Sequence, residues 1–243
     1  MGRTKMKKYK CMIGSKNLAS HVPETRWMTK TNVFNLVTKY GQVILKPLGG
    51  SRGRGIIRVA RLGDGHYQIH RENQKRILHG QDQMYSFLKR KTGGSTYLVQ
   101  QRVPLATVQG RPFDIRVIVQ RRSVSKEWNV TGIVTKVAGQ GYIVTNITRS
   151  KGTLLSIGTA LHRSSLSGHS RELLISRIKR LALLTAKRLG KIYPHQRIYG
   201  MDIGLDKNGH AWMIEANRKP LMSHFLKLKD KSMYRRIQAY KKG

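Results

Sequence analysis

The sequence of 243 residues has little cysteine, little acidic charge and no long apolar run. Its single cysteine, Cys11, excludes an internal disulfide, and such a chain fits a reducing compartment. No apolar stretch approaches the roughly 18–20 residues that cross a membrane. The basic residues 1–10 are not followed by the apolar stretch of a secretory signal. We therefore expect a cytoplasmic protein without a membrane span.

The shortage of acidic residues leaves a large excess of positive charge. The 11 Asp and Glu residues face 48 Lys and Arg residues, which gives a formal charge of +37. A chain this basic attracts polyanions such as nucleic acids, acidic peptides, anionic wall polymers and phosphorylated metabolites. A generally cationic, solvated surface is the plain alternative. Because acidic residues are so few, the place of each one is informative.

The apolar pattern predicts the α+β class. A basic segment, residues 1–40, precedes two parts that cover residues 41–104 and 105–243. The predicted helices cover residues 30–40, 82–91 and 170–189, and a basic helical tail begins at Ser223. The predicted strands cover residues 42–47, 55–62, 67–70, 97–103, 113–121, 128–138 and 142–150, and two more flank residues 206–210.

A glycine-rich stretch joins the first two predicted strands, where residues 43–59 read VILKPLGGSRGRGIIRV. It is neither a Walker A motif nor a Rossmann fingerprint, because a strand and not a helix follows Gly55. Glycine lets backbone amides approach an anion closely, and Lys46 would place a positive charge beside that anion. The stretch therefore predicts a phosphate-binding hairpin, and a solvated hairpin without a ligand is the alternative.

The dipeptide Asn208-Gly209 predicts a two-residue hairpin turn. In that register Asp202 lies opposite Glu215, and Asn217 shares their face of the sheet. Opposed carboxylates repel each other, and a divalent cation would turn the repulsion into binding. An all-oxygen set of this size suits Mg²⁺. Two alternatives remain: one carboxylate pairs with a lysine or arginine, or a three-residue loop puts Asp202 on the other face.

The chain resembles the ATP-grasp superfamily. The resemblance rests on the order of three features along the sequence: Lys46, the glycine-rich loop, and Asp202 followed by Glu215-x-Asn217. The finer resemblance is to the endospore coat-associated YheC/YheD family. It is carried by HVPET at residues 21–25, VILKPLGGSRGRGI, YLVQQ, PFDIRV, VTGIVTKVAGQG, the Asn146 region, MDIGLDKNGHAWMIEAN and Lys219-Pro220. These motifs run over most of residues 20–220 and are jointly specific. The resemblance implies an ATP-grasp fold, with ATP and Mg²⁺ held between two α+β lobes.

The resemblance also implies roles for single residues. Lys46 precedes the phosphate loop, and Arg116 of the Asp114-Ile115-Arg116 element faces the transferred phosphoryl group. Asn146 and Arg149 match a downstream pair of ligases that add amino acids to acidic ends. The implied loop residues are Gly49, Gly50, Ser51, Arg52, Gly53 and Gly55; the implied adenine contacts are Gln100, Gln101 and Val103; the implied metal ligands are Asp202, Glu215 and Asn217.

Three functions stay open at this point. The first is an ATP- and Mg²⁺-dependent carboxylate–amine ligase that works through an acyl phosphate and whose acceptor is an acidic peptide or an anionic polymer. The second is a spore-associated structural or ATP-binding protein that makes no product. The third is a nucleic-acid binder, which has the charge but no recognisable motif. Only residues 1–40 precede the strand of Lys46, where full ligases carry a separate acceptor-binding domain, so we expect that domain to be missing.

Overall fold

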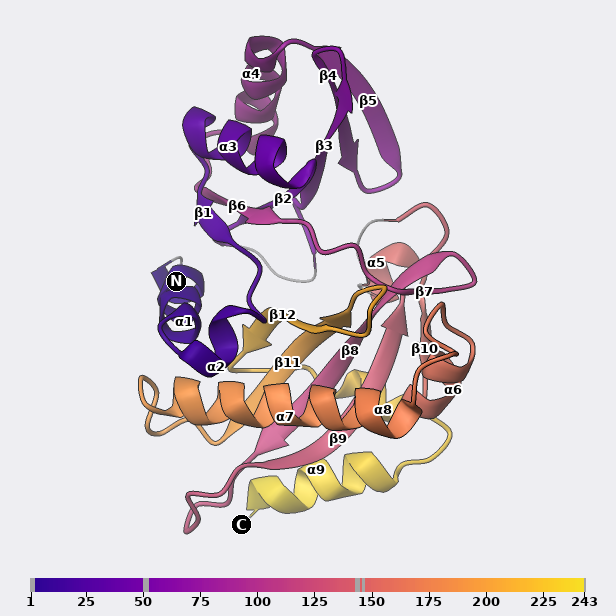
Figure 1. Ribbon diagram of the computed structural model, residues 1–243. Helices are drawn as coiled ribbons and strands as arrows, with labels where there is room; N and C mark the ends of the chain where they lie inside the picture. The colour runs from indigo at the N-terminus through magenta and orange to yellow at the C-terminus, as the bar shows by residue number, and fades with distance from the viewer. Residues whose placement is uncertain (1–2, 50–52, 143–144, 146, 243) are drawn as a thin grey trace.

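The computed structural model describes residues 3–49, 53–142, 145 and 147–242. Two antiparallel sheets form two lobes, one above the other in Figure 1. The strand order is β1-β6-β2-β3-β4-β5 in the smaller lobe and β10-β9-β8-β11-β12 in the larger lobe, where β7 also pairs with β8. The mixture of helices and antiparallel sheets confirms the predicted α+β class.

The smaller lobe places two helices on one face of its sheet. Alternate strand residues such as Val43, Leu45 and Val59 are fully buried against these helices, and Gly41 ends the first helix in a left-handed conformation with φ of 70°. The lobe comprises β1 (Thr25–Trp27), α3 (Lys30–Tyr40), β2 (Gln42–Pro47), β3 (Ile57–Gly63), β4 (His66–Arg71), β5 (Gln74–His79), α4 (Gln81–Thr92) and β6 (Tyr97–Gln101).

The larger lobe has two differently covered sheet faces. Helix α7 covers one face, where Leu174, Ile178 and Leu181 pack against strand residues such as Ile115 and Val117. The lobe comprises α1 (Arg3–Ile13), α2 (Lys16–Ala19), β7 (Thr107–Val108), β8 (Arg111–Gln120), β9 (Asn129–Val137), α5 (Ile147–Ser150), β10 (Thr153–Leu155), α6 (Ile157–His162), α7 (Arg171–Gly190), β11 (Ile198–Leu205), β12 (Ala211–Asn217), α8 (Ser223–Leu226) and α9 (Ser232–Lys242).

The other face of the larger sheet is apolar at one end of its strands and charged at the other. At one end Ile118 and Val134 pack beneath Phe225 of α8 and Ile237 of α9. Two residues earlier on β8, Arg116 points from the same face because side chains alternate along a strand. That end of the face lies toward the smaller lobe (Figure 1), and its charged residues, among them Arg116, are buried.

Two sequence predictions need correction. The strand expected over residues 142–150 is wrong at its end, because Ile147–Ser150 form α5, and the strand that pairs with β9 is β10. Residues 1–40 do not form one segment: α1 packs on α7, whereas β1 pairs with β6. The predicted helical tail from Ser223 is confirmed, because its residues form α8 and α9, and α9 buries Ile237 against the sheet.

Candidate functional site

The β11–β12 hairpin brings Asp202 opposite Glu215, as predicted, but by a different route. The turn has three residues between Asp206 and His210, whose backbones are hydrogen-bonded, and Gly209 takes a φ of 69°. That turn alone would shift the register by one residue. A β-bulge between Asp202 and Ile203 shifts it back, so the two carboxylates face each other again.

Asp202 lies in a buried network of charged side chains. Arg116 donates from Nε to Oδ1 at 2.7 Å and from Nη2 to Oδ2 at 3.0 Å, and Nζ of Lys136 donates to Oδ1 at 2.9 Å. The same Lys136 ammonium lies 2.8 Å from Oδ1 of Asp114, and the Thr145 hydroxyl donates to Oδ2 of Asp114. All five side chains belong to buried residues, so each charge has a partner in a medium of low dielectric.

The network sets the pKa values of its two aspartates apart. Burial alone would raise the pKa of Asp202, but the charges of Arg116 and Lys136 outweigh it and hold that pKa well below its usual range. Burial raises the pKa of Asp114, which Lys136 offsets only in part. Asp202 is therefore the more firmly ionised of the pair, and its charge belongs to the ion network.

This pairing corrects the physical reason given for a metal. Asp202 and Glu215 do not form an unrelieved pair of charges, because Arg116 and Lys136 neutralise Asp202. Within the described residues, Glu215 has no ion pair, and no group of three or more His, Cys, Asp or Glu residues could hold a metal. Glu215 and Asn217 share one face and offer oxygen ligands, whereas a free cation would meet ammonium groups nearby. The set fits Mg²⁺ that arrives with phosphate better than Mg²⁺ alone.

Lys46 lies between the lobes, beside the predicted metal ligands. Its Nζ lies 3.5 Å from the carbonyl oxygen of Ile214, the residue that the bulge in β12 leaves unpaired. Burial lowers the pKa of Lys46, and the nearby Glu215 acts in the opposite direction. The strand of the smaller lobe thus points its ammonium group at the larger lobe, next to Glu215.

The glycine-rich loop follows Lys46 directly. Gly53 and Gly55 have positive φ values of 73° and 75°, and a Cβ on Gly55 would lie 2.8 Å from the hydroxyl of Tyr97, so that position requires glycine. Gly49 is exposed, with no atom near an added Cβ. Three predicted loop residues lie outside the described residues: Gly50, Ser51 and Arg52.

The predicted adenine contacts lie at the end of β6, but two of their side chains are engaged elsewhere. Nε2 of Gln100 donates to Oγ1 of Thr25 at 2.7 Å, and Oε1 of Gln101 accepts from the Glu24 amide at 3.2 Å. These contacts attach the β1 segment to the sheet. Val103 is buried, and within the described residues its amide has no hydrogen-bond partner. Adenine recognition here would therefore use backbone groups.

Two further predicted positions fall in or beside α5. Arg149 belongs to that helix, but its side chain lies outside the described part, as does residue Asn146. Neither is therefore placed relative to Arg116.

Sequence reasoning missed four residues that line this region. Lys136 lies directly opposite Asp114 on β9, a pairing that the predicted strands could have suggested. Lys5 and Lys8 reach the site from α1, and no local motif marks them. His224 of α8 lies near Arg116 and Lys136, and burial followed by those two charges lowers its pKa to about 4.

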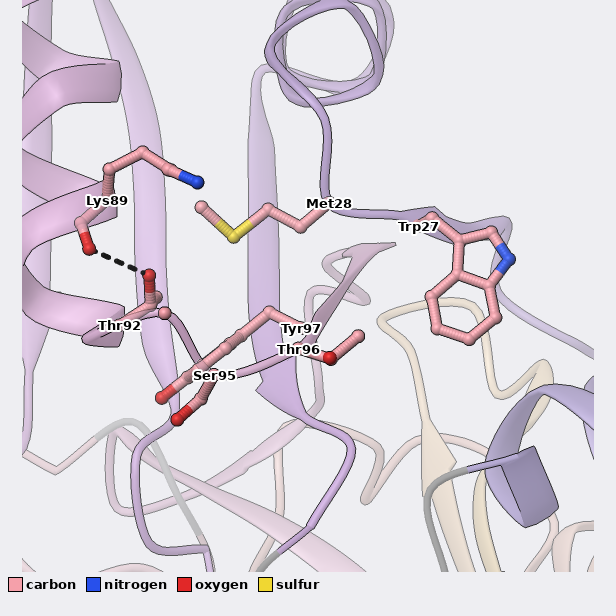
Figure 2. Close-up of a pocket in the computed structure, with 8 residues that line it drawn as sticks. Trp27, Met28, Lys89, Thr92, Ser95, Thr96 and Tyr97 are labelled. Atoms are coloured by element: carbon pink, nitrogen blue, oxygen red, sulfur yellow. Dashed lines mark hydrogen bonds between the residues drawn. The ribbon is translucent and has the colours of Figure 1, made fainter.

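A separate pocket of about 150 Å³ lies in the smaller lobe, away from the predicted site residues. Figure 2 shows the Met28 side chain extending toward Lys89 of α4, whereas the Trp27 ring lies on the opposite side of the view. The Thr92 hydroxyl donates to the Lys89 carbonyl oxygen at 3.1 Å. Ser95 and Tyr97 close the lower side of this pocket in the view. None of the predicted ATP or metal contacts lines it, so it is not the site that the sequence predicts.

Among the described residues, none of the helices has both the length and the apolarity to cross a bilayer.

In sequence, the chain is 30% identical over 204 residues to the endospore coat-associated protein YheD of Bacillus subtilis (strain 168), a match that covers 79% of this chain and 42% of YheD. It is 24% identical over 205 residues to the endospore coat-associated protein YheC of the same organism, covering 82% of this chain and 55% of YheC. The chain thus spans about half the length of these curated relatives.

Solved structures with the same fold are ATP-grasp enzymes. The ADP complex of PurK, N5-carboxyaminoimidazole ribonucleotide synthetase, has a TM-score of 0.53 at 14% identity and covers 97% of this chain and 50% of its own. The ATP-grasp ligase PsnB complexed with a minimal precursor has a TM-score of 0.51 at 16% identity, covering 97% and 60%. The family described as YheC/D like ATP-grasp matches residues 2–241. The chain has the ATP-grasp fold and belongs to the YheC/D-like ATP-grasp family.

Proposed function

We propose that this chain is an ATP- and Mg²⁺-dependent ligase that joins a carboxylate to an amine through an acyl phosphate. The observation that supports this most is the closeness of Lys46 and Arg116 to Glu215, whose charge acts on both, beside the buried ion pairs that Asp202 makes with Arg116 and Lys136. Phosphoryl transfer needs positioning and neutralisation of charge rather than a protein nucleophile. Such an arrangement of fixed positive charge suits that requirement.

In the first step, a carboxylate oxygen of the substrate attacks the terminal phosphorus of ATP, the bond to the bridging oxygen breaks, and ADP leaves. Lys46 and the amides of the glycine-rich loop hold the triphosphate, with Gly49 to Gly55 as the loop. Arg116 faces the transferred phosphoryl group, and Arg149 is proposed to assist it. Backbone groups near Val103, with Gln100 and Gln101 beside them, hold the adenine.

In the second step, an amine attacks the acyl carbon, inorganic phosphate leaves, and the nitrogen loses a proton to give the amide. Asp202, Glu215 and Asn217 would hold Mg²⁺, which neutralises charge on the phosphate oxygens when bound. Because Asp202 is already paired, Glu215 and Asn217 contribute the oxygens that are free to turn toward the metal. Asp202 orients Arg116 through its two-point contact.

The substrate carboxylate is proposed to lie on an acidic peptide or anionic polymer, because the formal charge of +37 favours polyanions. An acidic peptide is therefore a sensible first probe. The relatives YheC and YheD are described as endospore coat-associated, so we also propose a spore-associated role for a protein made in the cytoplasm.

One observation favours a second candidate, an ATP-binding protein of the spore without ligase activity. Arg116 gives its Nε and Nη2 donors to Asp202, and an arginine held in this way would serve structure alone unless it also contacts the bound nucleotide. ADP release by the purified protein, measured over a panel of carboxylates and amines with mass spectrometry of the products, separates the two. An amide product supports the ligase, whereas nucleotide binding without ADP release under any pair supports the second candidate.

Nucleotide binding itself is tested by thermal melts with and without Mg²⁺-ATP. A ligand at 100 times its dissociation constant adds about 2.7 kcal/mol to a folded state that alone binds it. The midpoint should therefore rise at millimolar Mg²⁺-ATP. An unchanged midpoint would remove nucleotide binding from the proposal and leave only the fold.

A further inference from the structure

Helix α1 carries two lysines into the space between the lobes. Lys5 and Lys8 are one helical turn apart, so they lie on one face of α1. Nζ of Lys5 donates to the carbonyl oxygen of Pro47 at 2.7 Å, and Nζ of Lys8 donates to that of Ala216. Pro47 ends β2 just before the glycine-rich loop, and Ala216 follows Glu215 in β12. One helix therefore contacts both lobes beside the proposed site (Figure 1).

Positive charge exceeds negative charge where these lysines meet. Lys46 adds a third ammonium group, whose contact is the carbonyl oxygen of Ile214. Glu215 acts electrostatically on both Lys8 and Lys46, and Lys5 repels both. Among the described residues, none of these three lysines has a salt bridge. Carbonyl oxygens accept hydrogen bonds but carry no full charge, so the three ammonium groups outnumber Glu215, the first opposing charge on Lys8 and Lys46.

Lys8 is the least exposed of the three lysines. Its residue is only 8% exposed, and burial lowers its pKa, with Glu215 as the first opposing influence. A buried charge is costly unless an opposite charge accompanies it. An ammonium group has three N–H donors, and the Ala216 carbonyl oxygen uses one of them. An anion with several oxygen atoms would supply both the charge and the acceptors that are missing.

We propose that Lys5 and Lys8, together with Lys46, bind the terminal phosphate of the nucleotide, so that α1 forms one wall of the phosphoryl-transfer site. The terminal phosphate fits because the two lysines sit between the base of the glycine-rich loop and Glu215. Glu215 would hold a metal there, and that metal would neutralise charge on the phosphate oxygens. This inference rests on the proposed function, since it assigns two more residues to the same nucleotide.

The test compares the dissociation constants of Mg²⁺-ATP and Mg²⁺-ADP, measured by calorimetry on the full chain. The variants are Lys8→Met, which keeps the buried aliphatic stem, and Lys5→Gln, which keeps a hydrogen-bond donor. Lys10→Gln is the matched control, because Lys10 is exposed on the same helix and its loss removes the same charge. Hydrogen bonds to charged groups lead us to expect a loss of roughly tenfold or more in ATP affinity for Lys8→Met.

The expected result is selective. Lys8→Met and Lys5→Gln lose ATP affinity, keep ADP affinity within about threefold, and Lys10→Gln changes neither. Unchanged ATP affinity in both variants, or equal losses for ATP and ADP, would overturn the inference and leave α1 as a link between the lobes. If Lys8→Met does not melt as a folded protein, Lys5→Gln decides the question. Absence of nucleotide binding in the wild type would show instead that the proposed function has failed, and this inference with it.

Discussion

Arg116 holds both carboxylate oxygens of Asp202 across two neighbouring strands, with Nε 2.7 Å from Oδ1 and Nη2 3.0 Å from Oδ2. The two residues are paired in the β8–β11 register, so the backbone fixes their separation. Lys136 approaches the same carboxylate from β9. One aspartate thus joins side chains from three strands, and its charge stabilises the sheet as well as the proposed site.

Asp202→Asn should therefore destabilise the apo protein strongly. The substitution leaves Arg116 and Lys136 buried with less opposing charge, and breaking a buried ion pair in this way costs about 3–5 kcal/mol. Chemical denaturation without nucleotide measures the loss. Equal stability of Asp202→Asn and the wild type would show that water already screens the network.

Glu215→Gln should behave differently, which makes the two variants a matched pair. Glu215 has no ion pair among the described residues, although its charge opposes those of Lys8 and Lys46, so we expect the free energy of unfolding to fall by about 1 kcal/mol or less. Mg²⁺-dependent nucleotide binding should be lost, because the amide replaces an anionic ligand. A loss of several kcal/mol in the apo protein would make Glu215 a structural residue and contradict the metal assignment.

The sequence predicted the elements that depend on local patterns. Helix α3 has the predicted bounds and ends at the predicted Gly41, because an apolar stripe and a left-handed glycine are local signals. Strand β5 was not predicted, because most of its residues are exposed and its apolar pattern is weak. At residues 147–150 the β-branched residues suggested a strand, whereas the chain forms α5 there.

The candidate site was only partly predictable for a related reason. The predicted pairing of Asp202 with Glu215 is correct because two departures from the predicted hairpin cancel each other. The turn is one residue longer than predicted, and a bulge restores the register; the Asn-Gly dipeptide reveals neither. The partners of Asp202 come from β8 and β9, whose alignment depends on long-range pairing. Lys8 could not be found at all, because its contact with Ala216 joins residues far apart in the chain.

The stability of the protein should fall between about pH 6.5 and pH 4 because of His224. Burial lowers the pKa of this imidazole to about 4, whereas its value in the unfolded chain is near 6.5. In that range the unfolded state binds the proton and the folded state does not, so stability decreases as the pH falls. His224→Gln should flatten this part of the curve in denaturation measured at several pH values. An unchanged slope in the variant would assign the effect to other groups.

Gly209→Ala should destabilise the hairpin that carries Glu215. Gly209 has a φ of 69°, and an added Cβ would lie 2.7 Å from Cδ2 of Leu174 on α7. Strain at such a position and overpacking each cost about 1–3 kcal/mol. Asn208→Ala is the control, since Asn208 is exposed in the same turn. Urea denaturation of both variants should separate them by at least about 1 kcal/mol, and equal midpoints would mean that the turn relaxes freely.

Arg116→Lys separates the proposed chemistry from the general attraction of a basic protein for anions. Lysine keeps the positive charge but cannot make the two-point contact of arginine, so the group that faces the phosphoryl moiety should lose its orientation. Arg171→Lys is the matched control, because Arg171 is exposed in the first turn of α7.

With an acidic peptide as acceptor, ADP release by the wild type should rise, and the rise should disappear in Arg116→Lys but persist in Arg171→Lys. Peptide binding should stay nearly equal in all three proteins and weaken with salt, because many lysines and arginines share the attraction. Nucleic acid would show the same salt trend, so salt dependence alone does not decide. Tight binding of DNA or RNA, with no carboxylate able to stimulate ADP release, would replace the ligase by a polyanion-binding protein built on the ATP-grasp fold.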